Sequence, residues 1–302
     1  MTNTSNISKN ISSELNSEIS TTRPLSQEQI TQYQENGFVI IRGFFDPEEV
    51  EPIRKACEVD PEIKGSQLKF GDPQGKINQG AFWSDLGDSL LGVLPRLARM
   101  VNAAEVLLGG EVYHWHSKLV QKKPYSEGRF EWHQGYGVWY YDGCLFPGIL
   151  SCTIGINNHT KENGCLQVIR KSHLMGRIDH IPDGDSVWAD PKRMEQVLER
   201  LEVVYCELEV GDVVFFHPNT LHASDGNTTA QTRINMTCHY NLASNKPYWV
   251  EGREHRFYQP LKRLPDSAII DGNYNSVFEE HQFISPETVS KTIVEYTNIS
   301  RE

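Results

Sequence analysis

The amino-acid sequence predicts a mainly β fold preceded by helices, a sandwich or closed barrel of jelly-roll type. Helical spacing of apolar residues dominates before Gly110, whereas short segments rich in β-branched and aromatic residues dominate after it. These later segments are separated by turn signals such as ENG, VGD and PNT, and they recur over about 130 residues, as the strands of such barrels do. We expect the helical part to pack on the barrel.

The first helix is predicted by a capping box. Ser26 is followed three residues later by Gln29, which favours a helix over residues 27–35, and Gly37 should end that helix. The next segment, FVIIRGFF, has the β-branched and aromatic composition of a strand. The chain therefore should become ordered just before Ser26.

Two further helices are expected before the β part. Asp46 followed by Pro47 is a good helix start, and this helix should run through Cys57. Residues 58–83 are polar and rich in Gly and Pro, which predicts a loop. Apolar residues recur at helical spacing over residues 90–108 and predict a helix that faces the core.

The composition also predicts how the chain is divided. Residues 1–23 are rich in Asn, Ser and Thr and poor in large apolar residues, which is typical of a disordered tail. The remainder, residues 24–302, is expected to form a single domain. Its parts are a helical segment (24–109), a β core (110–245) and a C-terminal extension (246–302).

The charge of the chain limits its partners. A formal net charge of -11 argues against nucleic acid or an anionic membrane surface as a partner, and no apolar run approaches the length of a membrane span. The six cysteines form no CxxC pair, and the N-terminus lacks the apolar stretch of a secretory signal, so we expect reduced thiols in the cytoplasm. A small-molecule substrate and a monomer or weak homo-oligomer are expected.

The segment RFEWHQGYG suggests one half of a metal site. Strand alternation would place Glu131, His133 and Gly135 on one face, and Trp132 and Gln134 on the other. A metal-binding strand of the His-x-Asp kind would carry a carboxylate two residues after the histidine, where this chain has glycine. The segment alone therefore leaves the metal site incomplete.

A second histidine and an arginine follow later in the β part. His222 comes after the strand GDVVFFHP, and Arg233 begins the strand RINMTCHYN. A buried arginine beside a histidine could hold a small dicarboxylate, because guanidinium binds carboxylate through two parallel hydrogen bonds. In a chain with 11 histidines, however, core or surface positions are the ordinary explanation for any one of them.

Longer motifs around these residues narrow the interpretation. WHQxYGxWY, GCLFPxxLSCxI, ENGCLQVIxxSHxxGRIDH and GDVVFFHxNxLHxSDxNxxxxxR together closely resemble the phytanoyl-CoA dioxygenase-like (PhyH) family of Fe(II)- and 2-oxoglutarate-dependent oxygenases. The resemblance runs from about Leu25 to Leu261, most of the chain expected to be ordered. It implies a double-stranded β-helix (jelly roll, cupin-like) with N-terminal helices, in agreement with the strand pattern.

The resemblance also implies roles for individual residues. The family binds Fe(II) with two histidines and one carboxylate, which leaves positions for 2-oxoglutarate and O2. His133 matches the first histidine, His222 the second, and Arg233 the residue that binds the distal carboxylate of 2-oxoglutarate. Lys118 falls where a strand residue commonly reaches the cosubstrate, with a solvated edge position as the competing interpretation. Trp139 matches a position that lines the iron and cosubstrate pocket.

Gly135 departs from the family pattern, which has aspartate at this position. Three explanations compete. The chain could be an enzyme that has lost a ligand and its activity. Glu131 or Asp142 could supply the carboxylate instead. The position could also be left open for an exogenous anion, with glycine leaving room because it has no Cβ.

The third explanation is favoured on chemical grounds. Replacing aspartate by glycine removes one negative charge and the volume of a carboxylate beside the metal, and chloride restores both. The pattern resembles the Fe(II)/2-oxoglutarate halogenases, which carry His-x-Gly or His-x-Ala. In those enzymes an iron(IV)-oxo species removes hydrogen from an unactivated carbon, and the carbon radical takes chloride.

The expected function is therefore that of a freestanding halogenase. It would chlorinate an unactivated aliphatic carbon of a small soluble molecule, using Fe(II), 2-oxoglutarate, chloride and O2. Two alternatives stay open: a hydroxylase with water or substrate in the open position, and an inactive pseudo-oxygenase that only binds 2-oxoglutarate. Substrate contacts are expected from Arg177, Asp179, His180 and Tyr136, for which a salt-bridged surface loop or barrel core is the competing interpretation.

Overall fold

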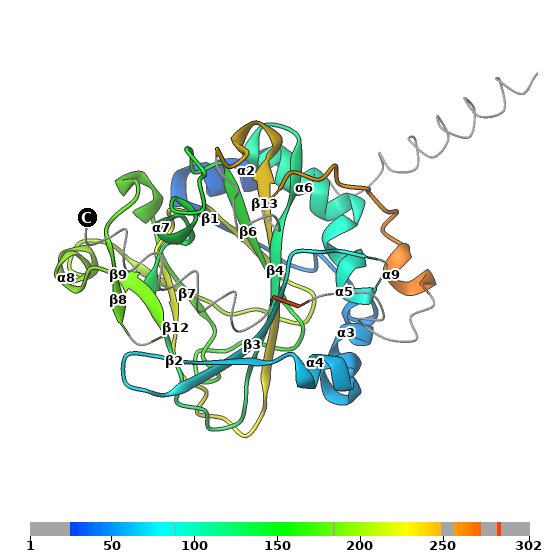
Figure 1. The fold of residues 1–302 in the computed structure, drawn as a ribbon, viewed down its shortest axis with the longest axis horizontal. Helices are drawn as coiled ribbons and strands as arrows, with labels where there is room; N and C mark the ends of the chain where they lie inside the picture. Colours follow the sequence, from blue (N-terminus) through cyan, green and yellow to red (C-terminus); the bar gives the residue numbers. More distant parts are fainter. Residues whose placement is uncertain (1–24, 88, 184, 249–256, 273–282, 285–302) are drawn as a thin grey trace, which may run out of the picture.

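Two β-sheets face each other and form a double-stranded β-helix, or jelly roll (Figure 1). The computed structural model describes residues 25–87, 89–183, 185–248, 257–272 and 283–284. In sheet order, the large sheet consists of β1 (Phe38–Ile41), β11 (Val213–Phe216), β6 (Ile149–Gly155), β13 (Arg233–Leu242), β4 (Val112–Lys122), β3 (Ile77–Trp83) and β2 (Leu68–Gly71). The small sheet consists of β10 (Val203–Cys206), β7 (Leu166–Ile169), β12 (His222–Ser224) and β5 (Phe130–His133). A separate hairpin pairs β8 (His180–Asp183) with β9 (Ser186–Ala189).

Helices cover the outer face of the large sheet (Figure 1). They are α2 (Gln27–Asn36), α3 (Pro47–Val59), α4 (Pro61–Gly65), α5 (Leu90–Val93), α6 (Ala98–Leu108) and α9 (Ala268–Asp271), with the 3-10 turn η2 (Leu94–Arg96) between α5 and α6. Elsewhere lie α7 (Gly135–Trp139), α8 (Pro191–Leu198), η3 (Ser172–Met175) and η4 (Ala243–Asn245). Leu94, Leu97 and Met100 are fully buried under this layer, and each such side chain contributes about 1.5–3 kcal/mol by burial.

The first predicted helix boundary is confirmed in detail. In α2 the Ser26 hydroxyl accepts the Gln29 backbone N–H, and the Gln29 side chain accepts the Ser26 N–H. Gly37 ends the helix with φ of 83°, a left-handed conformation that glycine adopts without strain. The chain then enters β1, as the FVIIRGFF segment predicts.

The prediction for residues 58–108 is wrong in two places. The expected loop over residues 58–83 contains α4 and the β2–β3 hairpin, so the predicted helical part supplies three strands of the large sheet. The expected continuous helix over residues 90–108 is interrupted, because Pro95 has no backbone N–H to donate and Leu97 is extended, with ψ of 136°. Short strands without strict alternation carry too little signal to be distinguished from a loop.

Alternation along β13 separates an apolar face from a polar one. Ile234, Met236, Cys238 and Tyr240 join the core beneath the helices. Arg233, Asn235, Thr237 and His239 lie on the opposite face, between the two sheets, and all four are buried. Buried polar groups require partners: Thr237 bonds Thr153 at 2.9 Å, and His239 bonds Ser151 at 2.9 Å. β13 therefore presents a polar face to the space between the sheets.

The predicted tail and most of the predicted C-terminal extension lie outside the described residues. Within the described ranges no helix combines the length and apolarity that a membrane crossing requires. All six cysteines are buried and none is in a disulfide, as expected for reduced thiols.

Candidate metal and cosubstrate site

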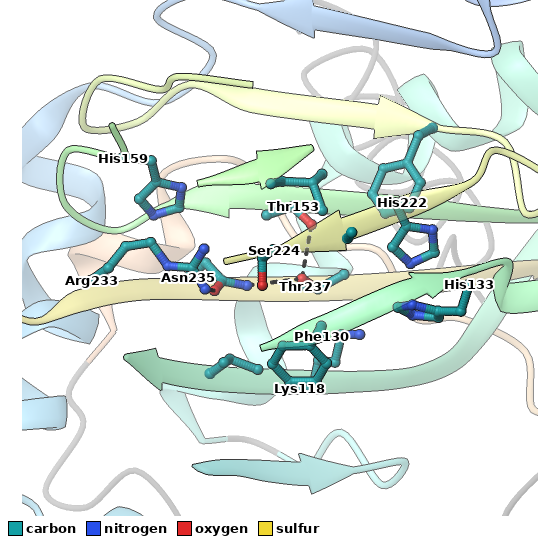
Figure 2. Close-up of a pocket in the computed structure, with 14 residues that line it drawn as sticks. Lys118, Phe130, His133, Thr153, His159, His222, Ser224, Arg233, Asn235 and Thr237 are labelled. Atoms are coloured by element: carbon teal, nitrogen blue, oxygen red, sulfur yellow. Dashed lines mark hydrogen bonds between the residues drawn. The ribbon is translucent and has the colours of Figure 1, made fainter. Parts of the chain in front are cut away.

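A cavity between the two sheets brings together residues from strands that are distant in sequence (Figure 2). Its polar wall consists of Lys118, His133, Thr153, His159, His222, Ser224, Arg233, Asn235 and Thr237. Figure 2 shows the two histidines His133 and His222 at one end and Arg233 at the other. The cavity thus unites four of the residues singled out in the sequence: His133, His222, Arg233 and Lys118.

His133 and His222 lie side by side where β5 pairs with β12. The two residues are direct partners in the strand register, and their ring centroids are 4.0 Å apart. The Nδ1 of His133 bonds the Glu131 carbonyl at 2.8 Å, and the Nδ1 of His222 bonds the Thr220 carbonyl at 2.9 Å. A carbonyl can only accept, so each Nδ1 carries the hydrogen and each Nε2 keeps its lone pair for a metal ion.

Burial keeps both imidazoles neutral. It lowers the pKa of His222 from 6.5 to about 3, and it lowers the pKa of His133 well below its usual value, with His222 adding to the effect. The neutral ring is the form that binds metal. In tautomer and protonation state, this pair therefore fits two ligands of an Fe(II) ion.

In the described part of the chain, no third protein ligand lies beside the histidines. Among the residues that the structure describes, no group of three or more His, Cys, Asp and Glu side chains is placed to share a metal ion. Gly135 lies at the start of α7, and a Cβ built on it would come within 2.6 Å of the Trp139 ring. Trp139 therefore covers the place where a side chain at position 135 would begin.

The predicted alternation along β5 is wrong because the strand contains a β-bulge. His222 pairs with His133 and Ser224 with Phe130, so three steps on β5 oppose two on β12. Phe130 and His133 both line the cavity, whereas Glu131 and Trp132 both line a separate groove beside β8, β9 and α8. The strand also ends at His133, so Gly135 does not continue its face.

The two carboxylates considered as alternative metal ligands, Glu131 and Asp142, lie away from the cavity. Glu131 is turned into the outer groove, where Trp188 also lies. Asp142 is buried in the turn after α7, with its backbone N–H donated to the Trp139 carbonyl, and it is not part of the cavity wall. Neither carboxylate is placed with the two histidines, so the structure gives no support to a substitute carboxylate from these residues.

Arg233 forms the opposite end of the cavity. Its Nη1 donates to the Gly164 carbonyl and its Nη2 donates to Asn235 Oδ1 at 3.0 Å. Its buried Nε has no hydrogen-bond partner among the described residues. Burial lowers the Arg233 pKa from 12.5 to about 10, so the guanidinium stays charged at neutral pH. A buried charge with an unsatisfied donor fits a carboxylate ligand.

Lys118 adds a second positive charge to the cavity wall. Burial lowers its pKa from 10.5 to about 8. The residues that line the cavity include no Asp or Glu, so neither Lys118 nor Arg233 meets a carboxylate there. Two cations without an internal counter-ion match the charge of a dicarboxylate such as 2-oxoglutarate. Lys118 faces the cavity, and the competing interpretation of a solvated edge position does not apply.

His159 is a member of the cavity wall that sequence reasoning missed. Its Nε2 donates to the Ile234 carbonyl at 2.9 Å, and its buried Nδ1 has no partner among the described residues. Burial lowers its pKa from 6.5 to about 3, with Arg233 as the second cause. The residue lies in a loop after β6, where no periodic pattern reveals which way it faces, so only the folded structure could find it.

The residues expected to touch substrate do not line the cavity. Arg177 lies over the Tyr140 and Tyr141 rings at 4.7 and 5.0 Å, and donates to the Tyr141 hydroxyl. Its ion pair with Asp179 is 3.7 Å long, and the Asp179 side chain is 92% exposed, which is the salt-bridged surface loop weighed above. The Tyr136 hydroxyl donates to the Cys144 and Leu145 carbonyls.

His180 and Trp139 also lie outside the cavity wall. His180 is buried and bonds the backbone of Gln134 and Ile178. Trp139 belongs to an aromatic cluster with Tyr113, Trp115 and Tyr136, and its ring centroid is 4.9 Å from that of His239. Trp139 thus borders, through Gly135, the end of the cavity with the two histidines, which we call the metal end. It is not part of the end with Arg233, which we call the anion end.

Comparisons with known proteins identify the family of the chain. The phytanoyl-CoA dioxygenase (PhyH) family model matches residues 33–235. An ectoine dioxygenase from Bordetella parapertussis is 28% identical over 236 residues, 73% of this chain and 77% of the relative. An L-proline trans-4-hydroxylase from Streptomyces griseoviridis is 31% identical over 177 residues, 53% of this chain and 66% of the relative.

A solved structure shares the same fold. The crystal structure of EctD from S. alaskensis with 2-oxoglutarate and 5-hydroxyectoine superposes with a TM-score of 0.67 at 26% identity, covering 82% of this chain and 90% of that one. The predicted jelly-roll fold is thereby confirmed. The relatives named here are a dioxygenase and a hydroxylase, so they favour hydroxylation over the expected halogenation.

Proposed function

The chain belongs to the phytanoyl-CoA dioxygenase (PhyH) family of Fe(II)/2-oxoglutarate-dependent oxygenases, and we propose that it oxidises an unactivated aliphatic carbon of a small polar molecule. One observation carries this proposal: a single cavity has two neutral histidines at one end and a buried arginine at the other, with a lysine but no carboxylate on its wall. When bound, iron and 2-oxoglutarate would activate O2, which is the oxidant for an unactivated C–H bond. The protein supplies position and charge.

Each residue has a role that follows from its contacts. His133 and His222 present Nε2 to the metal because backbone carbonyls hold both Nδ1 hydrogens. Arg233 offers its unsatisfied Nε to the distal carboxylate of 2-oxoglutarate. Lys118 lies on the wall of the same cavity and adds a second positive charge against the dianion. The role of Trp139 is to cover Gly135.

Hydroxylation is the outcome that the relatives favour. The named ectoine dioxygenase and L-proline trans-4-hydroxylase both belong to oxygen-inserting classes. In this chain a hydroxylase would hold iron with two histidines, and water or substrate would fill the third position. Ectoine and L-proline are therefore the first substrates to test.

Halogenation is a second candidate, favoured by one specific observation. Gly135 brings no side chain to the metal end, and within the described ranges no carboxylate joins His133 and His222. An exogenous halide would restore the missing negative charge beside iron. Chloride is the halide we propose for that position, in which case the carbon radical would receive chlorine instead of hydroxyl.

One experiment separates these outcomes. Anaerobic protein is titrated with Fe(II) and 2-oxoglutarate, with and without chloride, while the metal-to-ligand charge-transfer absorption is followed. Oxygen is then admitted with ectoine, L-proline or a wider panel of small molecules, and succinate and product masses are measured. Absence of the absorption band in protein that binds Fe(II) would overturn the cosubstrate assignment.

The products then decide the reaction. A product that gains one oxygen atom, with cosubstrate binding indifferent to chloride, establishes hydroxylation. A product with the chlorine isotope pattern, together with tighter 2-oxoglutarate binding in chloride, establishes halogenation. Tight binding of 2-oxoglutarate without turnover across the panel leaves the role of a binding protein.

A further inference from the structure

Gln134, which lies between His133 and Gly135, is tied into the protein by its whole side chain. It is completely buried. Its Nε2 donates to the Gly176 carbonyl at 2.7 Å and to the Asn219 carbonyl at 2.8 Å, and its Oε1 accepts the Ile178 N–H at 2.8 Å. Every side-chain hydrogen of this amide therefore has a partner.

The backbone of the same residue is held by His180. The Gln134 N–H donates to His180 Nε2 at 2.9 Å, and His180 Nδ1 donates to the Ile178 carbonyl at 2.9 Å. The imidazole is thereby fixed as the Nδ1-protonated tautomer with Nε2 as acceptor. Gly137 makes the close approach possible, because a Cβ on it would come within 2.1 Å of the His180 ring.

These contacts join three segments that surround the metal end. Gln134 follows His133 directly, and its partner Asn219 precedes His222 by three residues. A second link runs alongside, since the Tyr136 N–H donates to the Pro218 carbonyl at 3.0 Å. We call Gln134 and His180, with their bonds to residues 176–178 and 219, the Gln134–His180 clamp.

We propose that the Gln134–His180 clamp sets the position of His133 and Gly135 relative to His222, so that Gln134 and His180 are positioning residues of the metal centre. This inference rests on the proposed function, because it assigns the clamp to the same two histidines. Neither residue lines the cavity, so neither is a catalytic residue. Each acts through the backbone that carries His133 and the turn at Gly135.

The chemistry of the contacts explains why position depends on them. Loss of the Gln134 amide leaves the half-buried Gly176 carbonyl, the buried Asn219 carbonyl and the buried Ile178 N–H without partners, which favours rearrangement of those segments. The register of β5 against β12 covers only a few residues and contains a bulge, so it constrains the end of β5 weakly. The clamp supplies the constraint just where β5 ends. Partners of this kind around metal ligands typically alter metal affinity or activity by about 10–100-fold.

The test compares four variants. Gln134→Met removes the amide at similar volume, and His180→Leu removes the acceptor of the Gln134 N–H. His180→Gln is the conservative variant, because its Oε1 can take the place of Nε2. Asn245→Leu is the matched control: it removes a buried amide with comparable bonds to Asn241 and Phe146, outside the cavity.

The readouts are Fe(II) affinity without cosubstrate, the charge-transfer spectrum with 2-oxoglutarate, and the midpoint of thermal unfolding. We expect Gln134→Met and His180→Leu to weaken Fe(II) binding by about 10–100-fold and to shift the spectrum, with substantial recovery in His180→Gln. Asn245→Leu should lose thermal stability while its Fe(II) affinity stays that of the wild type.

The contrary result is equally clear. If Gln134→Met and His180→Leu lose stability as Asn245→Leu does, and keep wild-type Fe(II) affinity and spectrum, the clamp is only a structural network. Should Gln134→Met fail to fold, His180→Leu and its rescue by His180→Gln still decide. A wild-type protein that binds Fe(II) but shows no 2-oxoglutarate band contradicts the proposed function, whereas the Fe(II) affinities of the variants test the clamp independently.

Discussion

The two ends of the cavity are held in opposite ways. At the metal end, His133 and His222 each donate Nδ1–H to a carbonyl two residues earlier in the chain, so the backbone fixes both rings without a ligand. At the anion end, Arg233 lies in a wall without carboxylates, and its Nε has no partner in the described part of the chain.

The difference shows which end of the cavity is preorganised in the empty protein and which end is stabilised only when its ligand binds. Preorganised donors and lone pairs lose little freedom when a metal binds. A buried charge without a counter-ion, in contrast, destabilises the empty protein until an anion enters. We therefore read the metal end as complete in its protein parts apart from the open third position, and the anion end as completed by the cosubstrate.

The largest effect is expected from the metal end. Replacing either His133 or His222 by alanine removes half of the protein's ligand set, so Fe(II) affinity should fall by more than about 100-fold, beyond what loss of an outer partner costs. Titration of Fe(II) under anaerobic conditions measures this. His173→Ala, which removes a half-buried histidine bonded to the Gln34 carbonyl, should bind Fe(II) as the wild type does. Equal losses in all three variants would contradict the assignment.

The next effect belongs to the anion end. Arg233→Gln should weaken 2-oxoglutarate binding by about 30- to 5000-fold, because truncating one partner of a buried charge pair costs about 2–5 kcal/mol. Fe(II) affinity without cosubstrate should hardly change, which separates the two ends. Isothermal titration of both ligands tests this, with Arg129→Gln, an exposed arginine outside the cavity wall, as the control. A parallel loss of metal binding would remove the distinction between the ends.

The contact between the Trp139 ring and Gly135 should affect the free energy of unfolding when position 135 gains a side chain. Gly135→Asp places a Cβ within 2.6 Å of the Trp139 ring, and overpacking of this kind typically costs about 1–3 kcal/mol. Trp139→Phe makes room, so the two substitutions should couple favourably by about 1–2 kcal/mol in a double-mutant cycle. Urea unfolding of the four proteins measures the coupling. Additive effects would mean that Trp139 does not limit position 135.

The smallest effect is a pH dependence from Lys118. Its pKa of about 8 means that the amine is charged below that pH and neutral above it. Bound 2-oxoglutarate favours the charged amine, so cosubstrate affinity should be constant below pH ~7 and fall by at most about tenfold as the pH rises to ~9. Arg233, with a pKa of about 10, stays charged over this window. In Lys118→Met the fall should disappear while the affinity at low pH is lower.

The sequence motifs identify the residues at the two ends of the cavity, but they do not reveal the contacts between the segments that carry these residues. Motifs around His133, His222 and Arg233 are long and ordered, and the structure places all three residues in one cavity. The bulge in β5 and the turn into α7 cannot be predicted from the sequence, because a strand of four residues is too short to show where its alternation is interrupted. Gln134 was assigned only to a strand face, since nothing local distinguishes an amide that bonds distant carbonyls from one that faces water.

The bulge in β5 has a practical consequence for laboratory evolution. Because it turns Glu131 and Trp132 into the outer groove while Phe130 and His133 stay on the cavity wall, positions 131 and 132 can be randomised together without replacing any residue that lines the cavity. A library at these two positions would vary the groove beside Trp188, whose ring centroid lies 5.6 Å from that of His133, while His133 and His222 keep their identities. Because of this inserted residue, neighbouring positions in a four-residue strand line different pockets and can be substituted separately.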